Sequence, residues 1–456
     1  MKRIISLLLV VIMMASIVAC NDTPAVTSGK QESENAETPE SPPEETPEET
    51  PGETEPVDEA KLDDPIELLA EGSSVTVVIP ANADRNINYA SDRFINGVKR
   101  LANAEIALGT AEQEVEILIG DTGRAESETL KATLGEDEFA VKLMGKKLVV
   151  VATEDAFLYE AVGVLLDFIK VDGNADVADG SITLKRSIDV KQEGDKSSYV
   201  YLFAQSTVLT SKAYNYVTFA LPDDEIRATQ GGCYDGTKYF YQGYIWHDGN
   251  TEANNKVIIV KYDFERKVRV AQSEILSLNH CNDMTYVPDL NLIAVVNHGP
   301  NKTTITFINP ETLTVEYTKK IAIAVYAIAY NHERNRYATG VSNSRDIRRW
   351  ESDLTFKLSE KLIVANKVSD GYTTQGICAD ENFIYCVFWD SKNKNNKDFQ
   401  NIATVYDWYG NYVGVIEFDV GKIEPENIFI RNGSVYVTCH SGGAKIYKLV
   451  ASVPAE

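Results

Sequence analysis

Four of the five histidines in this 456-residue chain fall toward the same end of the units of a repeated pattern. Tryptophan, tyrosine, asparagine, glutamine and acidic residues stand at neighbouring positions of the same pattern. Aromatic faces beside imidazole, amide and carboxyl groups suit sugar rings, which present apolar faces and hydroxyl groups together. The candidate ligand-binding residues are Gln230, Trp246, His247, His280, Asn282, Asp283, His298, Tyr326, Gln375, Trp389, Asp390, Glu426, Asn427 and His440.

The same residue types leave other chemistry open. Glu426, Asp283 and Asp390 could form the carboxylate pair that glycoside hydrolysis requires, and histidine with tyrosine could serve acid–base elimination. Three histidines and an aspartate could hold a metal ion, and polar residues near an axis could simply bond one another. The sequence contains no His-Glu-x-x-His, Cys-x-x-Cys or Gly-x-Ser-x-Gly motif. We therefore expect binding without catalysis, with no metal and no cofactor.

These positions belong to a repeat of about 50 residues, as propeller blades have. Each unit predicts four short strands separated by Gly, Asn, Asp and Pro turns, which is typical of a β-propeller blade. We count five blades within residues 195–452, and a sixth built around 199–220 is the alternative. The equivalent segments begin at Gln230, Asn282, Tyr326, Gln375 and Glu426, which lie 52, 44, 49 and 51 residues apart.

In a propeller, the first strand of each blade starts at one end of the axis and the second strand returns there. We call this end the top face, and loops at such an end hold ligand sites. The repeat places the candidate residues at the top face and His332 at the opposite face. The last unit stops after its third strand, so we expect an outer strand from Tyr216–Ala220 or Tyr199–Ala204 to close the ring.

Two segments of the repeat carry a family resemblance. Gln-Gly-Gly-Cys-Tyr-Asp-Gly from Gln230 and His-Cys-Asn-Asp-Met-Thr-Tyr-Val-Pro from His280 resemble the propeller-like domain of the teichoic acid biosynthesis protein C family. That domain also occurs in phage structural proteins. The resemblance covers residues 230–300 well and extends loosely to 450. It implies a wall polymer or glycan as the ligand and indicates no catalytic residue.

Residues 65–190 alternate strand and helix patterns, which predicts a small α/β domain. The residues from 73 to 186 resemble the small α/β domain that precedes the barrel in β-hexosaminidases and α-glucuronidases, although Glu160 stands where that family usually has Gly. No helical periodicity follows residue 190, so the resemblance implies an accessory role beside carbohydrate and not hydrolysis. The predicted elements are strands at 75–79 and 115–119, a hairpin around Gly145, and helices at 91–101 and 154–170.

The sequence of the first 64 residues predicts a targeting signal followed by a linker. Lys2 and Arg3 precede a 16-residue apolar stretch that ends at Ala19, before Cys20. This resembles the bacterial lipoprotein signal, in which Cys20 is lipidated and holds the protein at the outer side of the cytoplasmic membrane. Residues 21–64 form an acidic linker rich in Pro and Glu, which cannot bury enough apolar surface to fold.

Charge and cysteine content restrict the partners. The chain has 44 Lys and Arg against 68 Asp and Glu, a net charge of −24, which argues against nucleic acid. Six Cys are too few for a disulfide scaffold, and we expect the five after Cys20 to be buried thiols. The sequence thus predicts a cell-surface lipoprotein that binds a glycan or wall polymer. A polysaccharide-acting glycosidase or lyase, or a protein-interaction scaffold, is the alternative.

Overall fold

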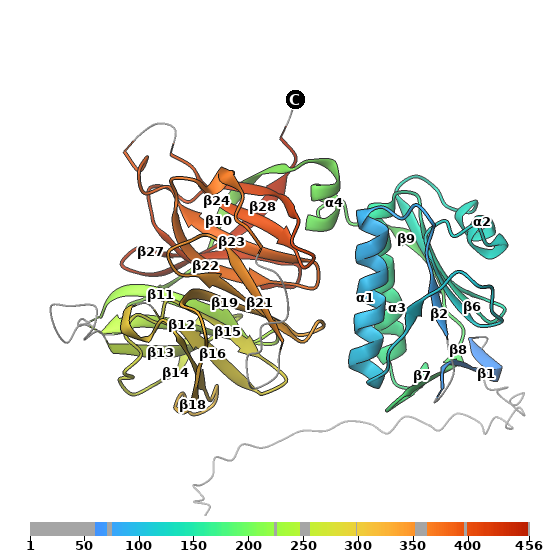
Figure 1. The fold of residues 1–456 in the computed structure, drawn as a ribbon, viewed down its shortest axis with the longest axis horizontal. Helices are drawn as coiled ribbons and strands as arrows, with labels where there is room; N and C mark the ends of the chain where they lie inside the picture. The colour runs from blue at the N-terminus through green and yellow to red at the C-terminus, as the bar shows by residue number, and fades with distance from the viewer. Residues whose placement is uncertain are drawn as a thin grey trace, which may run out of the picture. The chain divides into compact units, whose positions relative to one another are not determined.

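A computed structural model describes residues 60–70, 75–222, 226–246, 256–297, 299–351, 363–395 and 399–454 (Figure 1). The protein is mostly β, and its strands form several separate sheets. Cys20, His247, His298 and nearly all of the expected linker lie outside the described residues. Every described residue belongs to one compact unit, residues 58–456.

Residues 60–194 form what we call the mixed-sheet segment. The strands of its six-stranded sheet, in spatial order, are β3 (Ala107–Leu108), β2 (Thr76–Val78), β4 (Glu116–Ile119), β6 (Lys147–Ala152), β5 (Glu138–Met144) and β9 (Asp189–Glu193). The first four strands run parallel to one another, whereas β5 is antiparallel to both of its neighbours, β6 and β9. A smaller sheet holds β1 (Lys61–Leu69), β8 (Ser181–Arg186) and β7 (Ala175–Ala178).

Two helices bury their apolar sides against this sheet, namely α1 (Arg85–Ala102) and α3 (Leu158–Lys170). A Cβ at Gly97 would come within 2.6 Å of the Leu166 side chain, so the glycine lets the two helices approach closely. Helix α1 begins six residues before its expected start because the Asp84 side chain accepts a 2.9 Å hydrogen bond from the Ile87 N–H. A third helix, α2 (Ala125–Lys131), follows β4.

The boundaries of this segment differ from those expected. Strand β1 begins at Lys61, inside the range expected to be linker, because Lys61 and Ile66 pair with β8. Strand β9 extends to Glu193, beyond residue 190, because it pairs with β5. The expected elements themselves are present, with the second helix preceded by a 3₁₀ turn at Asp155–Phe157.

Residues 226–452 form five consecutive groups of antiparallel strands, and β10 (Val208–Ala220) joins the last two groups into one eight-stranded sheet. The first group is β11 (Ile226–Tyr234), β12 (Tyr239–Trp246), β13 (Lys256–Asp263) and β14 (Val268–Gln272); the second is β15 (Asp283–Val287), β16 (Leu292–Val296), β17 (Thr304–Ile308) and β18 (Val315–Lys320). The third is β19 (Val325–Asn331), β20 (Arg336–Val341) and β21 (Ile347–Glu351). The fourth is β22 (Thr373–Ala379), β23 (Phe383–Trp389), β24 (Asn401–Asp407) and β25 (Tyr412–Asp419); the fifth is β26 (Pro425–Arg431), β27 (Ser434–His440) and β28 (Gly443–Ser452).

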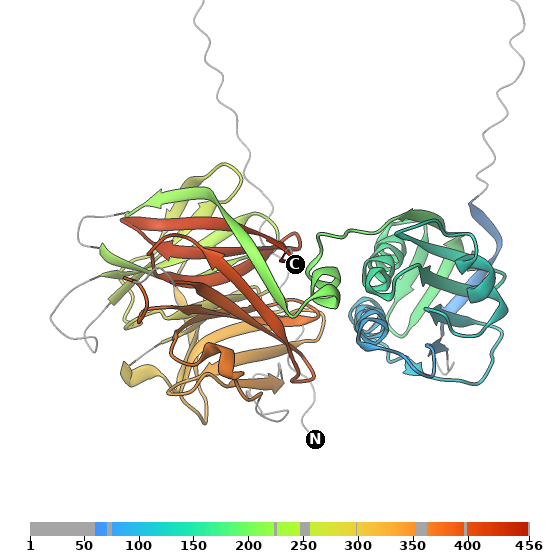
Figure 2. The ribbon, with the colours of Figure 1, turned by 90° about the horizontal axis from the view of Figure 1, so that it is seen from above.

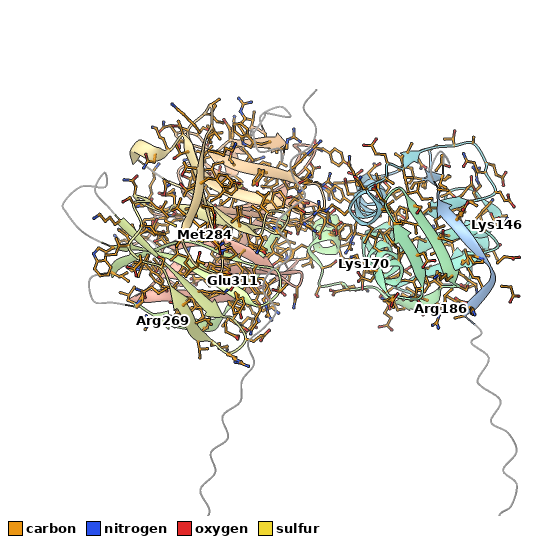
Figure 3. The ribbon with its side chains drawn as sticks, turned by 90° about the horizontal axis from the view of Figure 1, so that it is seen from below. Lys146, Lys170, Arg186, Arg269, Met284 and Glu311 are labelled. Carbon is orange, nitrogen blue, oxygen red and sulfur yellow. The ribbon has the colours of Figure 1, made fainter. Side chains whose placement is uncertain are left out.

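The first strands of the five groups form a closed circle. Strand β11 packs against β15, β15 against β19, β19 against β22, β22 against β26, and β26 against β11 again. We call residues 208–452 the strand ring. Met284 points into its interior, whereas Arg269 and Glu311 lie at its surface (Figure 3).

A strand from before the first repeat closes the ring. Strand β10 (Val208–Ala220) pairs with β28, with Phe219 opposite Ala444, and its first residues run parallel to β25. Figure 2 shows this strand in green beside the red strands of the last group. Residues 216–220 therefore supply the expected outer strand, whereas Tyr199–Gln205 form helix α4, capped by Ser198. No other sheet precedes β11 within the described part of the ring.

Candidate functional site

Asp283 is the hub of the strand ring. Its side chain accepts hydrogen bonds from the backbone N–H groups of Met284 at 2.9 Å, Ile328 at 3.0 Å and Ile377 at 3.0 Å. Asn427 donates a fourth through Nδ2 at 2.6 Å. The carboxyl group therefore joins β15, β19, β22 and β26. Because Asp283 and Asn427 are fully buried, they hold the ring together and present no surface to a ligand.

Two further carboxyl groups lie close to this hub, each paired with a glutamine amide. Nε2 of Gln230 lies 3.4 Å from Oε2 of Glu426, and Nε2 of Gln375 lies 2.7 Å from Oε1 of Glu424. Burial raises the pKa of Glu426 well above its ordinary range, and the charge of Glu424 raises it further. Burial also raises the pKa of Glu424, and the hydrogen bond from Gln375 opposes that rise. Glu426 therefore carries its proton more readily than an ordinary carboxyl.

Three further candidates of the top face have hydrogen-bond partners within the protein. Nδ1 of His280 lies 2.6 Å from Oδ1 of Asn282. Nδ1 of His440 accepts from the N–H of Thr229 at 3.2 Å, and burial lowers the pKa of this histidine. Asp390 is buried and accepts from the N–H of Gln400 at 3.2 Å.

Trp389, Trp246 and Tyr326 are the aromatic candidates. Trp389 is half-buried, and its indole Nε1 has no acceptor among the described residues. The ammonium group of Lys394 lies 5.7 Å from the centre of the Trp389 ring. Trp246 is half-buried at the end of β12, and Tyr326 is buried against Gly340. Trp389 is thus the aromatic candidate that combines partial exposure with an unpaired polar atom.

The carboxylates predicted to pair have different hydrogen-bond partners. Asp283 bonds to the first strands of the ring, whereas Asp390 bonds within its own sheet at Gln400. The neighbouring carboxyls are Glu424 and Glu426, and the sequence analysis missed Glu424. The pattern Glu-Pro-Glu was the available signal, because residues two apart on a strand share a face. No group of three or more His, Cys, Asp or Glu that could hold a metal occurs among the described residues.

The cysteines agree with the expected thiol state. Cys233, Cys281, Cys378, Cys386 and Cys439 are all free, and all except Cys378 are buried. Burial raises the pKa of every one of these thiols, so they stay protonated and unreactive at neutral pH.

The opposite face holds a cavity of about 730 Å³ that the sequence analysis did not find. The turn between the first and second strand of each of the five groups contributes to its lining, as Asp235, Pro288, Glu333, Glu381 and Gly433 show. Residues of helices α1 and α3, the start of α4, the residues before α4 and the end of β28 also line it. Such a volume is in the range of small-molecule sites.

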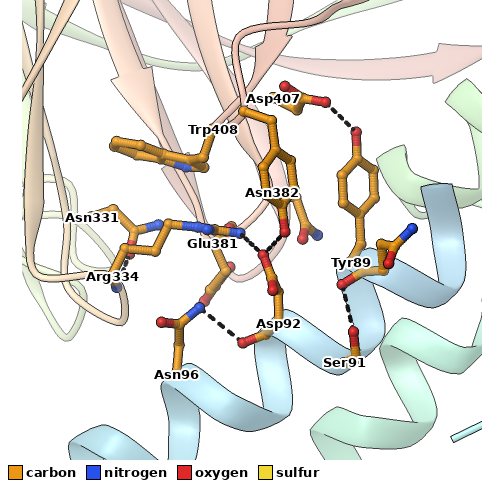
Figure 4. Close-up of polar contacts among 12 residues, drawn as sticks. Tyr89, Ser91, Asp92, Asn96, Asn331, Arg334, Glu381, Asn382, Asp407 and Trp408 are labelled. Atoms are coloured by element: carbon orange, nitrogen blue, oxygen red, sulfur yellow. Dashed lines mark hydrogen bonds and ion pairs between the residues drawn. The ribbon is translucent and has the colours of Figure 1, made fainter. Parts of the chain in front are cut away.

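Helix α1 also makes direct polar contacts with the ring (Figure 4). Tyr89 donates to Asp407 at 3.2 Å, and Arg334 forms a 3.3 Å ion pair with Asp92. Asp92 also accepts a hydrogen bond from the hydroxyl of Tyr409. These contacts join residues more than 240 positions apart, so the place of α1 beside the ring depends on long-range packing.

The comparisons with known proteins identify no family. No family model matches the chain, and no curated protein does. The crystal structure of Myxococcus xanthus glutaminyl cyclase is 12% identical, with a TM-score of 0.39, over 54% of this chain and 99% of that one. A tail fiber of Staphylococcus aureus phage P68 is 12% identical, with a TM-score of 0.39, over 56% of this chain and 55% of that one, so this chain spans about half its length. Likeness at this level carries no argument about function.

Proposed function

We propose that this protein is a cell-surface lipoprotein that binds a carbohydrate or wall polymer without catalysis. Acyl chains on Cys20 hold it at the outer side of the membrane, and residues 21–60 space the folded part from the lipid. The strand ring is a five-bladed β-propeller, and the mixed-sheet segment is its α/β accessory domain. The ligand binds at the top face of the ring.

The state of Trp389 carries the proposal. Its ring is partly exposed, and its Nε1 is a buried donor with no acceptor among the described residues. A sugar ring can lie on the exposed face of the indole, whereas the in-plane Nε1–H can donate to a hydroxyl of the polymer at the ring edge. Lys394 beside the ring and the His280–Asn282 pair add polar groups that suit a hydroxylated or anionic polymer.

Co-sedimentation with purified cell-wall sacculi tests this function. Residues 21–456 are mixed with sacculi that keep or lack their anionic polymers, and the pelleted fraction is measured. We expect Asn282→Ala combined with Trp389→Ala to abolish pelleting. Tyr214→Ala is the matched control, because it removes an aromatic side chain that is 54% exposed on β10.

The pelleted fraction distinguishes a top-face site from the absence of wall binding. Loss of pelleting in the double variant with retention in the control supports a top-face site, and removal of the anionic polymers shows which wall component is bound. Failure of the unmodified protein to pellet with either preparation rejects the wall ligand. In that case a protein partner bound by the ring becomes the working hypothesis.

The Glu424 and Glu426 pair favours a second candidate, a polysaccharide-acting glycosidase or lyase. Both carboxyls have raised pKa values, and one protonated beside one ionised carboxyl is the arrangement that glycoside hydrolysis uses. The test is release of reducing ends or unsaturated sugars from the same sacculi. Activity that Glu424→Gln removes supports an enzyme, and the absence of any product rejects it.

A further inference from the structure

We propose that the cavity on the opposite face of the strand ring binds a small ligand that carries a primary ammonium group. This site is separate from the top face, and its ligand need not be a polymer. Three properties of the cavity lead to this class of ligand: its charge, its unpaired hydrogen-bond acceptors and its aromatic walls.

The lining of the cavity is acidic. Its carboxyl side chains are Glu160, Asp195, Asp235, Glu333, Asp380 and Glu381. Only Arg93 and Lys448 among its Lys and Arg lining residues oppose these six, which leaves a formal charge of 2 − 6 = −4. Burial, and then the charge of Glu381, raise the pKa of Asp380 to about 7, and burial also raises the pKa values of Glu160 and Glu333. The carboxyl groups still outnumber the two cations of the lining. A cationic ligand is favoured in such a field.

Arg93 is already committed to other contacts. One guanidinium nitrogen donates to the backbone oxygen of Tyr159 at 2.9 Å, and the group stacks on the Tyr159 ring at 4.2 Å. The Tyr159 hydroxyl in turn donates to Oε2 of Glu381 at 3.2 Å. Arg93 therefore does not reach the other oxygens of the lining, although its own Nε is buried and has no partner among the described residues.

Two of these acceptors are buried and unpaired. Asn382 is only 3% exposed and lines the cavity, yet its Oδ1 accepts no hydrogen bond from the described residues. Oε2 of Glu333, another lining residue, is buried and unpaired in the same way. A buried acceptor without a donor costs about 1–3 kcal/mol, so native proteins rarely leave one unfilled. An N–H donor on a ligand would satisfy both the amide oxygen of Asn382 and the carboxylate oxygen of Glu333.

The walls of the cavity are aromatic. Tyr234, Tyr286, Tyr330 and Tyr385 line it from four different turns or strands of the ring, and Tyr199 lines it from α4. The hydroxyl of Tyr199 is also buried without a partner. Cations are attracted to tyrosine faces, and a primary ammonium group brings three donors to neighbouring acceptors. The acidic lining, the unpaired acceptors and the tyrosine walls therefore all favour a ligand with a primary ammonium group.

Titration calorimetry of residues 21–456 at pH 7 tests the proposal with two matched probes. Cyclohexylamine is an ammonium ion at this pH, and cyclohexanol is its uncharged counterpart of similar shape. We expect the amine to bind at least about tenfold more tightly than the alcohol, because one charge-assisted hydrogen bond provides about this factor. Equal affinity of the two probes, or no binding of the amine, overturns the proposal.

Two nearly isosteric variants locate the binding. Glu333→Gln and Glu381→Gln each remove one negative charge from the lining and keep the side-chain size, and we expect each to weaken amine binding about tenfold. Glu274→Gln is the control, because Glu274 is exposed and lies outside the cavity lining. Amine affinity that neither cavity variant changes places binding elsewhere and overturns the assignment. Circular dichroism of each variant verifies that it is folded.

Discussion

Nδ2 of Asn427 donates a 2.6 Å hydrogen bond to Oδ1 of Asp283, a residue that lies 144 positions earlier in the chain. The bond joins the second and the fifth groups of the strand ring across its axis. It leaves Oδ1 of Asn427 as a buried acceptor with no partner among the described residues. The centre of the ring is thus a polar network in which one carboxyl group serves several strands.

We expect Asp283→Ala to destabilise the ring by about 3–5 kcal/mol, because it leaves several buried donors without an acceptor. Urea unfolding followed by tryptophan fluorescence measures the change. Asp63→Ala is the control, because its exposed side chain lies on β1, away from the ring. A loss below about 1 kcal/mol, the value of a single ordinary hydrogen bond, would contradict the role of Asp283 as a hub.

Gly231 allows β11 to approach that hub. A Cβ at this position would lie 2.5 Å from the backbone Cα of Asp283, and a backbone atom cannot move aside as a side chain can. We expect Gly231→Ala to lower the free energy of unfolding by about 1–3 kcal/mol, the usual cost of overpacking.

The matched control is Gly135→Ala. There the closest atom to the new Cβ is Oε2 of Glu138 at 3.1 Å, the end of a flexible side chain. Thermal unfolding of both variants provides the comparison. Equal stability of the two would show that the first strands can separate slightly without cost.

Glu426 predicts a pH dependence of stability. Its pKa is raised in the folded protein, so the folded state binds more protons than the unfolded state does. Its contribution is fully present below the unfolded pKa of about 4.3 and is lost as the pH rises through the folded pKa. Glu426→Gln imitates the protonated form, so we expect the variant to gain stability over the native protein as the pH increases.

Urea unfolding at pH 5 and pH 8 checks this expectation. Each unit of pKa shift corresponds to about 1.4 kcal/mol of difference between the two proteins at high pH. Glu274→Gln, on an exposed side chain, controls for the general loss of a negative charge. A stability difference that stays constant from pH 5 to pH 8 would show that Glu426 titrates normally.

The sequence predicts where the strands of the ring lie better than it predicts which side chains pair across the ring. Residues such as Gln375 and Glu426 lie in first strands because turn residues and apolar alternation recur with the repeat. The pairing of Gln230 with Glu426, 196 positions away, depends on closure of the circle, which no local pattern encodes. The aromatic and apolar residues of helix α4 favour a strand, whereas the hydrogen bond that the Ser198 side chain accepts at its start is the local signal for a helix.

The cavity was missed for a related reason. Its walls come from the turns of all five groups and from the mixed-sheet segment, and turn residues such as Asp235 and Asp380 have an ordinary local role. The side chain of Asp380, for example, accepts from the N–H groups of Asn382 and Phe383, as aspartates in turns commonly do. Only the assembled ring places these turns around one space, so their shared charge is not visible in the sequence.

Tyr89 connects the mixed-sheet segment with the strand ring. Its side chain is 2% exposed, its hydroxyl donates to Asp407, and its ring meets Phe383 edge to face at 5.6 Å. Tyr89→Ala removes this buried aromatic contact, which costs about 3–5 kcal/mol in a well-packed core. We expect calorimetry to show two unfolding transitions in the variant where the native protein shows one, because the loss falls on the coupling between the two parts. Tyr89→Phe keeps the ring contact and should retain a single transition, with a loss of about 1 kcal/mol for the hydrogen bond. A single transition in Tyr89→Ala would mean that the remaining contacts of α1, such as the Asp92–Arg334 ion pair, couple the two parts without it.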